Sequence, residues 1–341
     1  MMPYAIEMRR LLVAVACMAA AAGAACSPAQ NDAATTTPPV AAPAGAAVDA
    51  GGVNGDSLVA DLARLADDSL RGRRAGTPEN ARARQWIAGR FQAIGLQRVP
   101  GPGVQGWLQD FGFTPRGGGA EVRGANVLGM VRGTAQPERY IVVTAHYDHV
   151  GVGRPVNGDS IYNGADDNAS GSAALLTLAR YFAAHPPRHS MIFAALDAEE
   201  MGLQGARAFV AAPPVPLASI ALDVNMDMVS HSAAGELYAA GAAHYPQLTA
   251  PLERVAARAP VTLRLGHDRP VPSARDDWTN QSDQGAFHAK GIPFVYFGVE
   301  DHPDYHQPSD EVRTITMPFY ANAVRTILMA ITELDRLNLA R

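Results

Sequence analysis

The chain has 341 residues, 48% of them hydrophobic, and a formal net charge of −5 at pH 7. This length suits one large domain or two small ones, and neither excludes an enzyme. The mild negative charge and the lack of a long basic run argue against nucleic acid as a partner.

The first 26 residues have the pattern of a secretory signal, so we expect an exported protein. Arg9 and Arg10 precede an apolar run over residues 11–22, which is too short to span a membrane, and small residues lead up to Cys26. These small residues are similar to a bacterial lipoprotein processing site, although Gly23 stands where a leucine is usual. Two interpretations stay open: lipidation of Cys26, which would tether the protein to the outer membrane as a lipoprotein, and simple cleavage, which would leave it periplasmic or secreted.

Residues 27–54 are mostly Ala, Pro, Thr and Gly, with almost no large apolar side chain. Such a segment cannot bury enough surface to fold, and we expect a flexible tether. Residues 55–341 are then expected to form a single domain. Cys17 is the other cysteine and lies in the apolar run of the signal, so this domain is expected to have no disulfide and no thiolate metal ligand.

Two helices are expected to open this domain, at residues 56–66 and 77–94. The second has Thr77 as N-cap, Pro78 at its first position and Gly95 just after its end. Short apolar runs then alternate with helical stretches. The runs are residues 140–145, 191–196, 220–224 and 293–297, and the helical stretches include residues 170–184 and 318–337. This alternation predicts an α/β fold with a mostly parallel central sheet.

Five side chains of metal-binding type follow the tether, in the order His146, Asp167, Glu200, Asp227 and His306. Zinc at neutral pH binds imidazole nitrogen and carboxylate oxygen in a compact shell, and a hydrolytic site keeps one position for water or substrate. Five ligands are too many for one catalytic zinc ion. They suit two ions if one carboxylate binds both, an arrangement that can activate a water and polarise a carbonyl.

Three of these side chains, His146, Glu200 and Asp227, follow shortly after an apolar run. In open α/β sheets, ligands bind in the crevice beyond the carboxyl ends of the strands. We therefore expect independent elements to direct these side chains to one place.

Each motif also has an ordinary structural interpretation when taken alone. An aspartate two residues after a histidine, as Asp148 after His146, is common in polar loops, but in an extended segment it can orient the imidazole of a metal ligand. Asp167 precedes a helical stretch, where Asp and Ser are frequent N-caps. Tyr305 and His306 could be a packed aromatic residue and a surface loop residue.

The adjacent glutamates have a more specific alternative. Such pairs usually mark a solvated helix start, but Glu200 could bind metal while Glu199 takes the proton that an attacking water loses. Asp227 lies among apolar residues, where an unpaired carboxylate is costly to bury, and this favours a metal-bound state.

Together the motifs resemble those of the co-catalytic zinc aminopeptidases of metallopeptidase family 28, which includes bacterial leucyl aminopeptidases and the catalytic domain of glutamate carboxypeptidases. The matching segments are AHYDHVG (145–151), NGADDNASG (163–171), AEEMGLQG (198–205), NMDM (225–228), SDQGAF (282–287) and YHQPSD (305–310). The resemblance extends over residues 58–337. It implies a three-layer sandwich of zinc-exopeptidase type, with helices on both faces of the sheet, and makes residues 55–341 a zinc-peptidase catalytic domain.

The resemblance also implies two zinc ions per chain, with Asp167 as the bridge. His146 and Asp227 would complete one zinc site, and Glu200 and His306 the other. The peptide bond between Asp167 and Asn168 would be cis.

Three further residues would take part in the chemistry. The resemblance makes Glu199 the general base and Tyr305 a residue that helps to hold the oxyanion, while Asp148 orients His146. Gln284 departs from the family, which often has a histidine after Ser-Asp. This leaves the ligands intact but puts local substrate contacts in doubt.

The expected function is that of an aminopeptidase acting on peptides with a free N-terminus. A carboxypeptidase of the same fold is an alternative that needs cationic groups for the substrate carboxylate. Candidates for these groups are Arg254, Arg258, Arg264, Arg269 and Arg275. A glutaminyl cyclase shares the fold but is similar to a one-zinc relative without the first histidine ligand, so His146 argues against it. A catalytically inactive tethered binding protein is the alternative from another class, although all five ligands and the base are present.

Overall fold

The computed structural model of the protein describes residues 52–269 and 276–339. The predicted signal, Cys26 and nearly all of the predicted tether lie outside these residues. The end of the predicted tether is already part of the fold, because Val53 is fully buried and Asn54 caps the first helix by accepting a hydrogen bond from the backbone N–H of Ser57.

The described residues form α-helices and β-strands along the whole of the two described ranges. The α-helices are α1 (Gly55–Leu65), α2 (Pro78–Ile94), α3 (Gly171–Ala184), α4 (Gln204–Ala211), α5 (Thr249–Ala256), α6 (Gln284–His288) and α7 (Met317–Asp335). The strands are β1 (Gln97–Arg98), β2 (Val104–Gln105), β3 (Leu108–Phe113), β4 (Val122–Val131), β5 (Gln136–His146), β6 (Gly151–Val156), β7 (Asp159–Tyr162), β8 (His189–Leu196), β9 (Ile220–Met226), β10 (Glu236–Ala240), β11 (Thr262–Leu265) and β12 (Phe294–Gly298).

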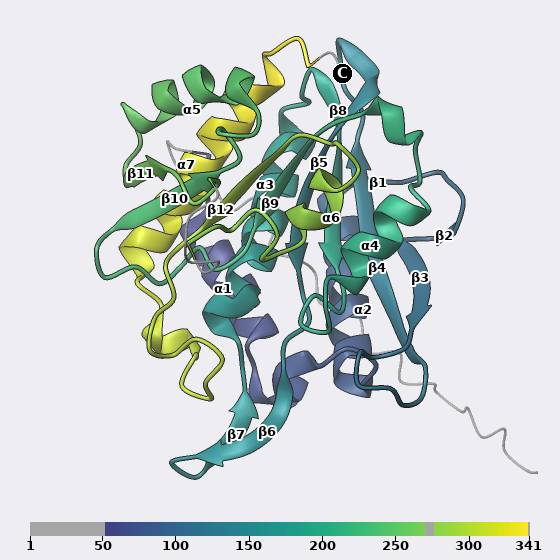
Figure 1. The fold of residues 1–341 in the computed structure, drawn as a ribbon, viewed down its shortest axis with the longest axis vertical. Helices are drawn as coiled ribbons and strands as arrows, with labels where there is room; N and C mark the ends of the chain where they lie inside the picture. Colours follow the sequence, from purple (N-terminus) through teal and green to yellow (C-terminus); the bar gives the residue numbers. More distant parts are fainter. Residues whose placement is uncertain (1–51, 270–275, 340–341) are drawn as a thin grey trace, which may run out of the picture. The chain divides into compact units, whose positions relative to one another are not determined.

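One large sheet forms the middle of this part of the chain (Figure 1). Its strand order is β11-β10-β12-β9-β5-β8-β4-β3-β2, with β1 also paired to β4. The four central strands β12, β9, β5 and β8 run parallel, whereas β4, β3 and β2 continue one side in antiparallel fashion. The expected sheet with a parallel centre is therefore present, and the four predicted apolar runs are its central strands.

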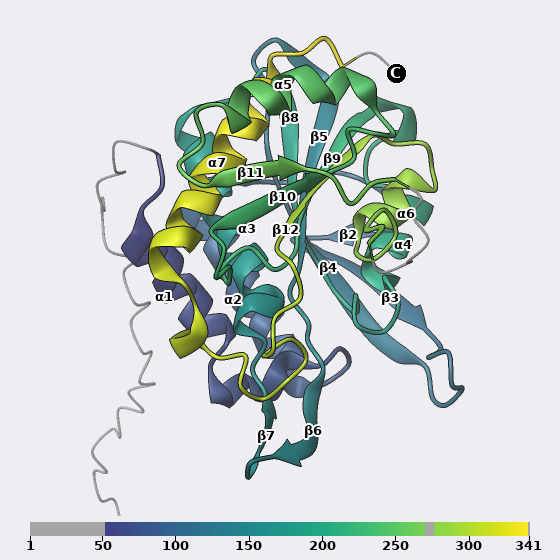
Figure 2. The ribbon, with the colours of Figure 1, turned by 60° about the vertical axis from the view of Figure 1, so that its left-hand side comes forward.

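Helices cover both faces of the sheet, as a three-layer sandwich requires (Figure 2). Alternate residues of each central strand point to opposite faces. On β5, Ile141 and Val143 pack in the core that holds α1, α2, α3, α5 and α7, while Val142 packs in the core that holds α4 and α6. Both faces are apolar, which explains why the central strands read as continuous apolar runs.

The opening helices follow the signals in the sequence. The Thr77 side chain accepts a hydrogen bond from the backbone N–H of Asn80, and Pro78 takes the first helical position of α2. Gly95 ends α2 in the left-handed conformation, at φ 87°, which favours glycine. The predicted boundaries of α1, α2, α3 and α7 hold to within two residues.

A small hairpin formed by β6 and β7 was not expected from the sequence. It projects away from the large sheet (Figures 1 and 2) and carries two exposed valines, Val152 and Val156.

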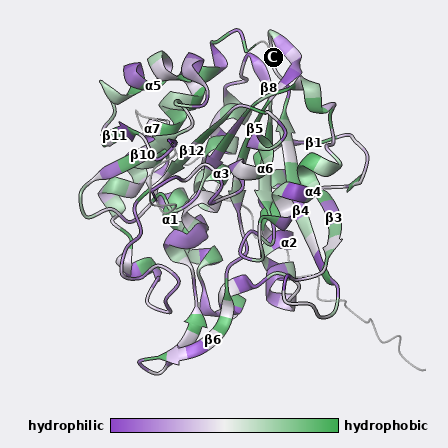
Figure 3. Cartoon of the chain, in the orientation of Figure 1, coloured by the Kyte–Doolittle hydropathy of each residue, from purple (hydrophilic) through white to green (hydrophobic). Residues whose placement is uncertain are grey.

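The central strands of the large sheet are apolar (Figure 3). Among the described residues, none of the helices combines the length and the apolarity needed to span a membrane.

Candidate metal centre

The parallel strands bring the predicted ligands to one edge of the sheet. His146 is the last residue of β5, Asp227 directly follows β9, and Glu199 and Glu200 follow β8 by three and four residues. Because these strands are adjacent and parallel, their carboxyl ends meet at the same edge. Asp167 and His306 reach this edge from loops.

The first donor group consists of His146, Asp167 and Asp227, all buried. The Nε2 atom of His146 lies 3.2 Å from Oδ1 of Asp227 and 3.4 Å from Oδ1 of Asp167. Two donors in a tetrahedral zinc shell with bonds of about 2.0–2.1 Å lie about 3.3 Å apart. The three side chains therefore have the spacing that a zinc ion requires.

The second donor group uses the other oxygen of Asp167. Oδ2 of Asp167 lies 3.0 Å from Nε2 of His306, which lies 3.2 Å from Oε2 of Glu200. Asp167 thus presents one oxygen to each group, as a carboxylate that binds two ions must. The structure brings together all five residues that the sequence singled out as ligands.

The second group also contains His149, which sequence reasoning did not select. Its Nδ1 atom lies 2.7 Å from Oε1 of Glu200 and 3.6 Å from Oδ2 of Asp167, and the ring is fully buried. Neither ring nitrogen of His149 nor Oε1 of Glu200 has a hydrogen-bond partner among the described residues. Unpartnered buried donors facing one another are the arrangement expected around a cation. The available signal was the second histidine of the segment His146-Tyr147-Asp148-His149.

A tight turn, Ala165–Ser170, holds Asp167 in position, and the Asp167–Asn168 peptide bond within it is cis. The carboxylate of Asp310 accepts hydrogen bonds from the backbone N–H groups of Asp166 and Asp167. Gly164 precedes the turn at φ 58°, and a Cβ atom there would lie 2.1 Å from the carbonyl oxygen of Asp167. This position therefore requires glycine.

The buried guanidinium group of Arg73 also stabilises this turn. It is fully buried and donates hydrogen bonds to five backbone carbonyls. These belong to Leu65, Tyr147, Asn163, Gly164 and Asp167. Arg73 thus connects the end of α1 with both ligand-bearing segments, 146–149 and 163–167.

Asp148 and Glu199 lie next to the first donor group. The carbonyl oxygen of Asp148 is 3.2 Å from Nδ1 of His146 and its Oδ1 is 3.6 Å away, so both atoms face that side of the ring. The same Oδ1 accepts a hydrogen bond from the backbone N–H of Glu199. Burial raises the pKa of the Glu199 carboxyl well above its usual range, whereas the neighbouring His146 acts in the opposite direction.

Tyr305 lies against the last ligand, its ring stacked on that of His306 at 4.1 Å between centroids. Burial, together with the charges of Asp167 and Asp227, raises the pKa of the Tyr305 hydroxyl. The hydroxyl therefore stays protonated at neutral pH and can donate a hydrogen bond.

A surface hollow of about 500 Å³ opens beside the donor groups and is lined by Glu199 and Glu200. Three exposed arginines, Arg74, Arg116 and Arg207, line it as well. Within residues 52–269 and 276–339, Arg116 and Arg207 pair with no carboxylate. This hollow therefore offers cationic groups next to the candidate base.

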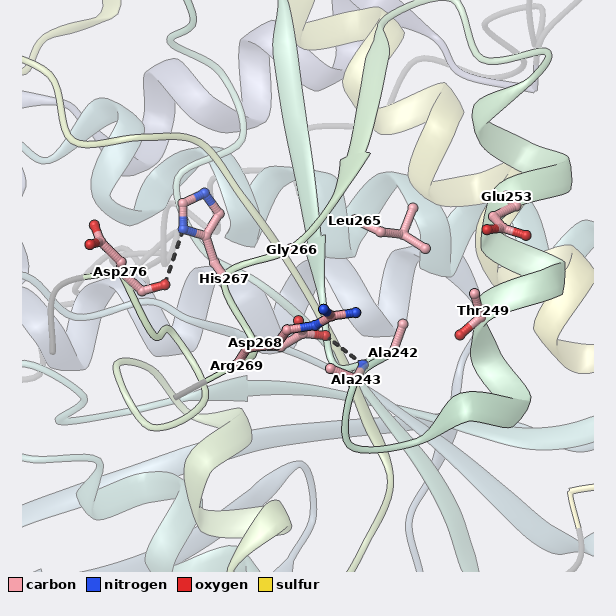
Figure 4. Close-up of a pocket in the computed structure, with 10 residues that line it drawn as sticks. All are labelled: Ala242, Ala243, Thr249, Glu253, Leu265, Gly266, His267, Asp268, Arg269 and Asp276. Atoms are coloured by element: carbon pink, nitrogen blue, oxygen red, sulfur yellow. Dashed lines mark hydrogen bonds between the residues drawn. The ribbon is translucent and has the colours of Figure 1, made fainter. Parts of the chain in front are cut away.

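A second hollow, of about 520 Å³, lies between β11 and α5 and contains none of the predicted ligands (Figure 4). Asp268 lines it, and its Oδ2 atom accepts hydrogen bonds from the backbone N–H groups of Gly241 and Ala243. His267 stacks on Trp278 at 3.8 Å between ring centroids. Asp268 and His267 thus stabilise the loops around this hollow through contacts within the protein.

Gln284, the departure from the family pattern, has a structural position. It is fully buried, accepts a hydrogen bond from the Asn225 side chain and donates one to the carbonyl of Trp278. It does not line the hollow beside Glu199. Gln284 therefore has a structural role in connecting Asn225 with Trp278.

Comparisons with known proteins point the same way as the geometry. The model of peptidase family M28 matches residues 126–331. A probable zinc metalloprotease of Pyricularia oryzae is 37% identical over 135 residues, which are 38% of this chain and 25% of that protein. Another, from Phaeosphaeria nodorum, is 28% identical over 203 residues, or 53% of this chain and 40% of that protein. The chain spans a quarter or less of the length of the first curated relatives that it matches.

Solved structures share the fold at low sequence identity. A zinc aminopeptidase from Bacillus subtilis superposes with a TM-score of 0.65 at 17% identity, over 84% of this chain and 97% of that one. The glutaminyl cyclase of Porphyromonas gingivalis superposes with a TM-score of 0.67 at 18% identity, over 83% and 99% of the two chains. These similarities establish the zinc-exopeptidase fold.

Proposed function

The chain belongs to peptidase family M28, and from this membership we propose that it is a zinc-dependent aminopeptidase that removes residues from peptides with a free N-terminus. The observation that carries the proposal is the pair of donor groups that share Asp167, with Glu199 beside them. The expected signal suggests that the protein acts after export.

Two zinc ions are proposed to occupy the two groups. His146, Asp167 and Asp227 would hold one, and Asp167, Glu200 and His306 the other, with His149 as an added donor. When bound, the ions would polarise the scissile carbonyl and lower the pKa of the attacking water.

The protein's own residues would then move the proton. Glu199 is proposed to take it from the attacking water and to return it to the leaving amine. Tyr305 is proposed to donate a hydrogen bond to the oxyanion, for which a raised hydroxyl pKa is suitable. Asp148 keeps the His146 ring in the orientation that directs Nε2 to the first group.

Glu199→Gln separates catalysis from metal binding. The amide cannot accept the proton, so we expect kcat to fall by a factor of about 10²–10⁴. Zinc content should be unchanged, because Glu199 is not among the donors. Peptide hydrolysis and metal analysis on the same preparation test this, and retained turnover would refute the assigned role.

The direction of attack on a peptide decides the exopeptidase class. The purified protein is incubated with a mixed peptide set in free and N-acetylated forms, with and without chelator, and the products are identified by mass spectrometry. Chelator-sensitive trimming from free amino ends alone supports the aminopeptidase. Trimming of both forms from the carboxyl end would overturn it.

A carboxypeptidase remains the second candidate because of the arginines in the hollow beside Glu199. Of the arginines that the sequence suggested, Arg254 and Arg258 are paired with Glu333, and Arg264 with Glu236. Arg269 lines the hollow between β11 and α5, and Arg275 lies outside the described residues. Arg74, Arg116 and Arg207 lie instead where a substrate carboxylate would meet them. They fit either a carboxypeptidase or an aminopeptidase that prefers short peptides, and the N-acetylated set distinguishes the two.

A further inference from the structure

A third cluster of metal-binding side chains lies apart from the two donor groups. It consists of His231, His302 and Asp304, each of which offers one donor atom, and these atoms all lie within 4.8 Å of one another. None of the three residues was singled out by the sequence motifs. None belongs to the groups that share Asp167.

The imidazole of His302 is held as a metal ligand would be. Its Nε2 atom lies 3.0 Å from Oδ2 of Asp166 and is hydrogen-bonded to it, and the side chain is only 8% exposed. A hydrogen bond donated from Nε2 to a carboxylate leaves the neutral ring with its lone pair on Nδ1. That Nδ1 atom is buried and has no hydrogen-bond partner within the described ranges.

The other two side chains bring their donors to the same place. The ring of His231 stacks on that of His302 with 4.0 Å between centroids, and its Nδ1 atom is likewise buried without a hydrogen-bond partner in the described chain. Oδ2 of Asp304 lies 4.0 Å from Nδ1 of His231. Oδ1 of Asp304 accepts a hydrogen bond from the Ser309 hydroxyl, which fixes the carboxylate and leaves Oδ2 available.

A water-accessible hollow gives this cluster a route to solvent. It has a volume of about 280 Å³ and is lined by His231 and His302, together with three acidic side chains. These are Glu236, Glu300 and Asp301. Glu236 is paired with Arg264, so the charges of Glu300 and Asp301 are the ones that favour entry of a cation. The hollow has room for the water molecules that would complete the shell of an ion with three protein donors.

We propose that His231, His302 and Asp304 form a third metal site, which binds a zinc-class transition-metal ion through two imidazole nitrogens and one carboxylate oxygen. Imidazole and carboxylate donors suit zinc and its neighbours rather than calcium or magnesium. Binding would require the Asp304 oxygen to move closer to Nδ1 of His231 by about 0.7 Å, from 4.0 Å to the separation of about 3.3 Å in a tetrahedral shell. It would also satisfy two buried nitrogens that otherwise lack partners.

The third site is connected to the shared carboxylate through Asp166. This residue accepts a hydrogen bond from His302 on Oδ2, accepts two from Ser230 on Oδ1, and directly precedes Asp167. An ion at the third site would therefore fix the turn that carries the bridge without contacting the substrate.

Metal stoichiometry tests the proposal without relying on activity. The full chain, stripped with chelator, is dialysed against rising concentrations of free zinc, and bound zinc is measured by mass spectrometry. We expect three ions per wild-type chain at saturation and two in His231→Ala, which should still hydrolyse peptides. Asp304→Asn, which should also bind two, serves as a second variant in case His231→Ala does not fold.

Asp301→Ala is the matched control, because Asp301 lines the same hollow but is not part of the cluster. It should retain three ions. Saturation of the wild type at two ions would overturn the proposal. Three ions in both His231→Ala and Asp304→Asn would overturn it as well, because the third ion would then lie elsewhere.

Discussion

His149 lies three residues beyond His146, where β5 has ended, and still faces the second donor group. The contact of His149 with Glu200 depends on the path of the loop after β5 and does not follow the alternation of side chains along a strand. Because its Nδ1 atom lies beside Oε1 of Glu200, it would either add to the shell of a bound ion or fix the orientation of that predicted ligand. Both roles strengthen metal binding.

His149→Ala is therefore expected to weaken zinc binding at the second group by about 10–100-fold. Competition with a chelator of known affinity measures the effect. His185→Ala is the control, because His185 is exposed and stacks on Tyr181 away from the donors. Equal zinc affinity in the wild type and His149→Ala would contradict the inference.

A different buried carboxyl, Asp223 on β9, is expected to make the free energy of unfolding depend on pH. Its Oδ1 accepts a hydrogen bond from Thr144, whereas its Oδ2 has no partner in the part of the chain that is described. Burial raises the pKa of Asp223 well above its usual range. The folded state thus binds this proton more tightly than the unfolded state, and stability falls as pH rises above the unfolded pKa of about 3.9.

Asp223→Asn should abolish this decrease in stability with rising pH, because the amide does not ionise. In chelator-treated protein we expect the variant to be more stable than the wild type by about 1 kcal/mol or more at pH 7, and equally stable at pH 4. Urea unfolding at both pH values measures the difference. Asp110→Asn, at an exposed position of β3, should change the free energy of unfolding little. A variant that is less stable than the wild type at pH 7 would count against the explanation.

At the scale of elements, the turn Ala165–Ser170 and the segment that follows β5 lie outside the strands of the large sheet. Arg73 holds them through hydrogen bonds from one planar group to carbonyls of both segments. A lysine has the same charge but a single amine, which cannot reach these carbonyls together. The buried carbonyls left behind would lack donors.

Arg73→Lys is expected to lower the free energy of unfolding by about 2–4 kcal/mol and to weaken zinc binding, because His146 and Asp167 lie on the segments it connects. Urea unfolding and chelator competition report the two effects. Arg82→Lys on α2 provides a control, since its partners are at the surface. Unchanged stability in Arg73→Lys would show that water replaces the guanidinium.

For the whole molecule, the metal ions are expected to couple the two halves of the described chain. The donors span residues 146–306, so ions that bind only the folded state stabilise the entire fold. Saturation at about 100 times Kd corresponds to about 2.7 kcal/mol for each site.

Zinc removal should therefore lower the Tm of the wild type, and restored zinc should recover it. Glu199→Gln should show the same recovery, whereas Asp167→Asn should recover less, because Asp167 serves both groups. Thermal unfolding with and without chelator measures this. A Tm that does not respond to zinc would contradict the coupling.

The central strands, the capped helices α1 and α2, and the five ligand candidates could be predicted from the amino-acid sequence alone. These features depend on signals within a few residues, such as apolar runs, the cap at Thr77 and motifs that follow a strand end. Parallel strands then bring such motifs to one edge, so their convergence could be predicted from the fold class.

The other parts of the site became visible in the three-dimensional arrangement of the chain. His149, Arg73 and the cluster around His302 acquire their roles from contacts across large sequence separations, 94 residues between Arg73 and Asp167 and 136 between His302 and Asp166. The arginines at the hollow beside Glu199 also come from separate elements. Local patterns do not encode such contacts, because the paths of loops fix which distant side chains meet and which buried donors are left without a partner.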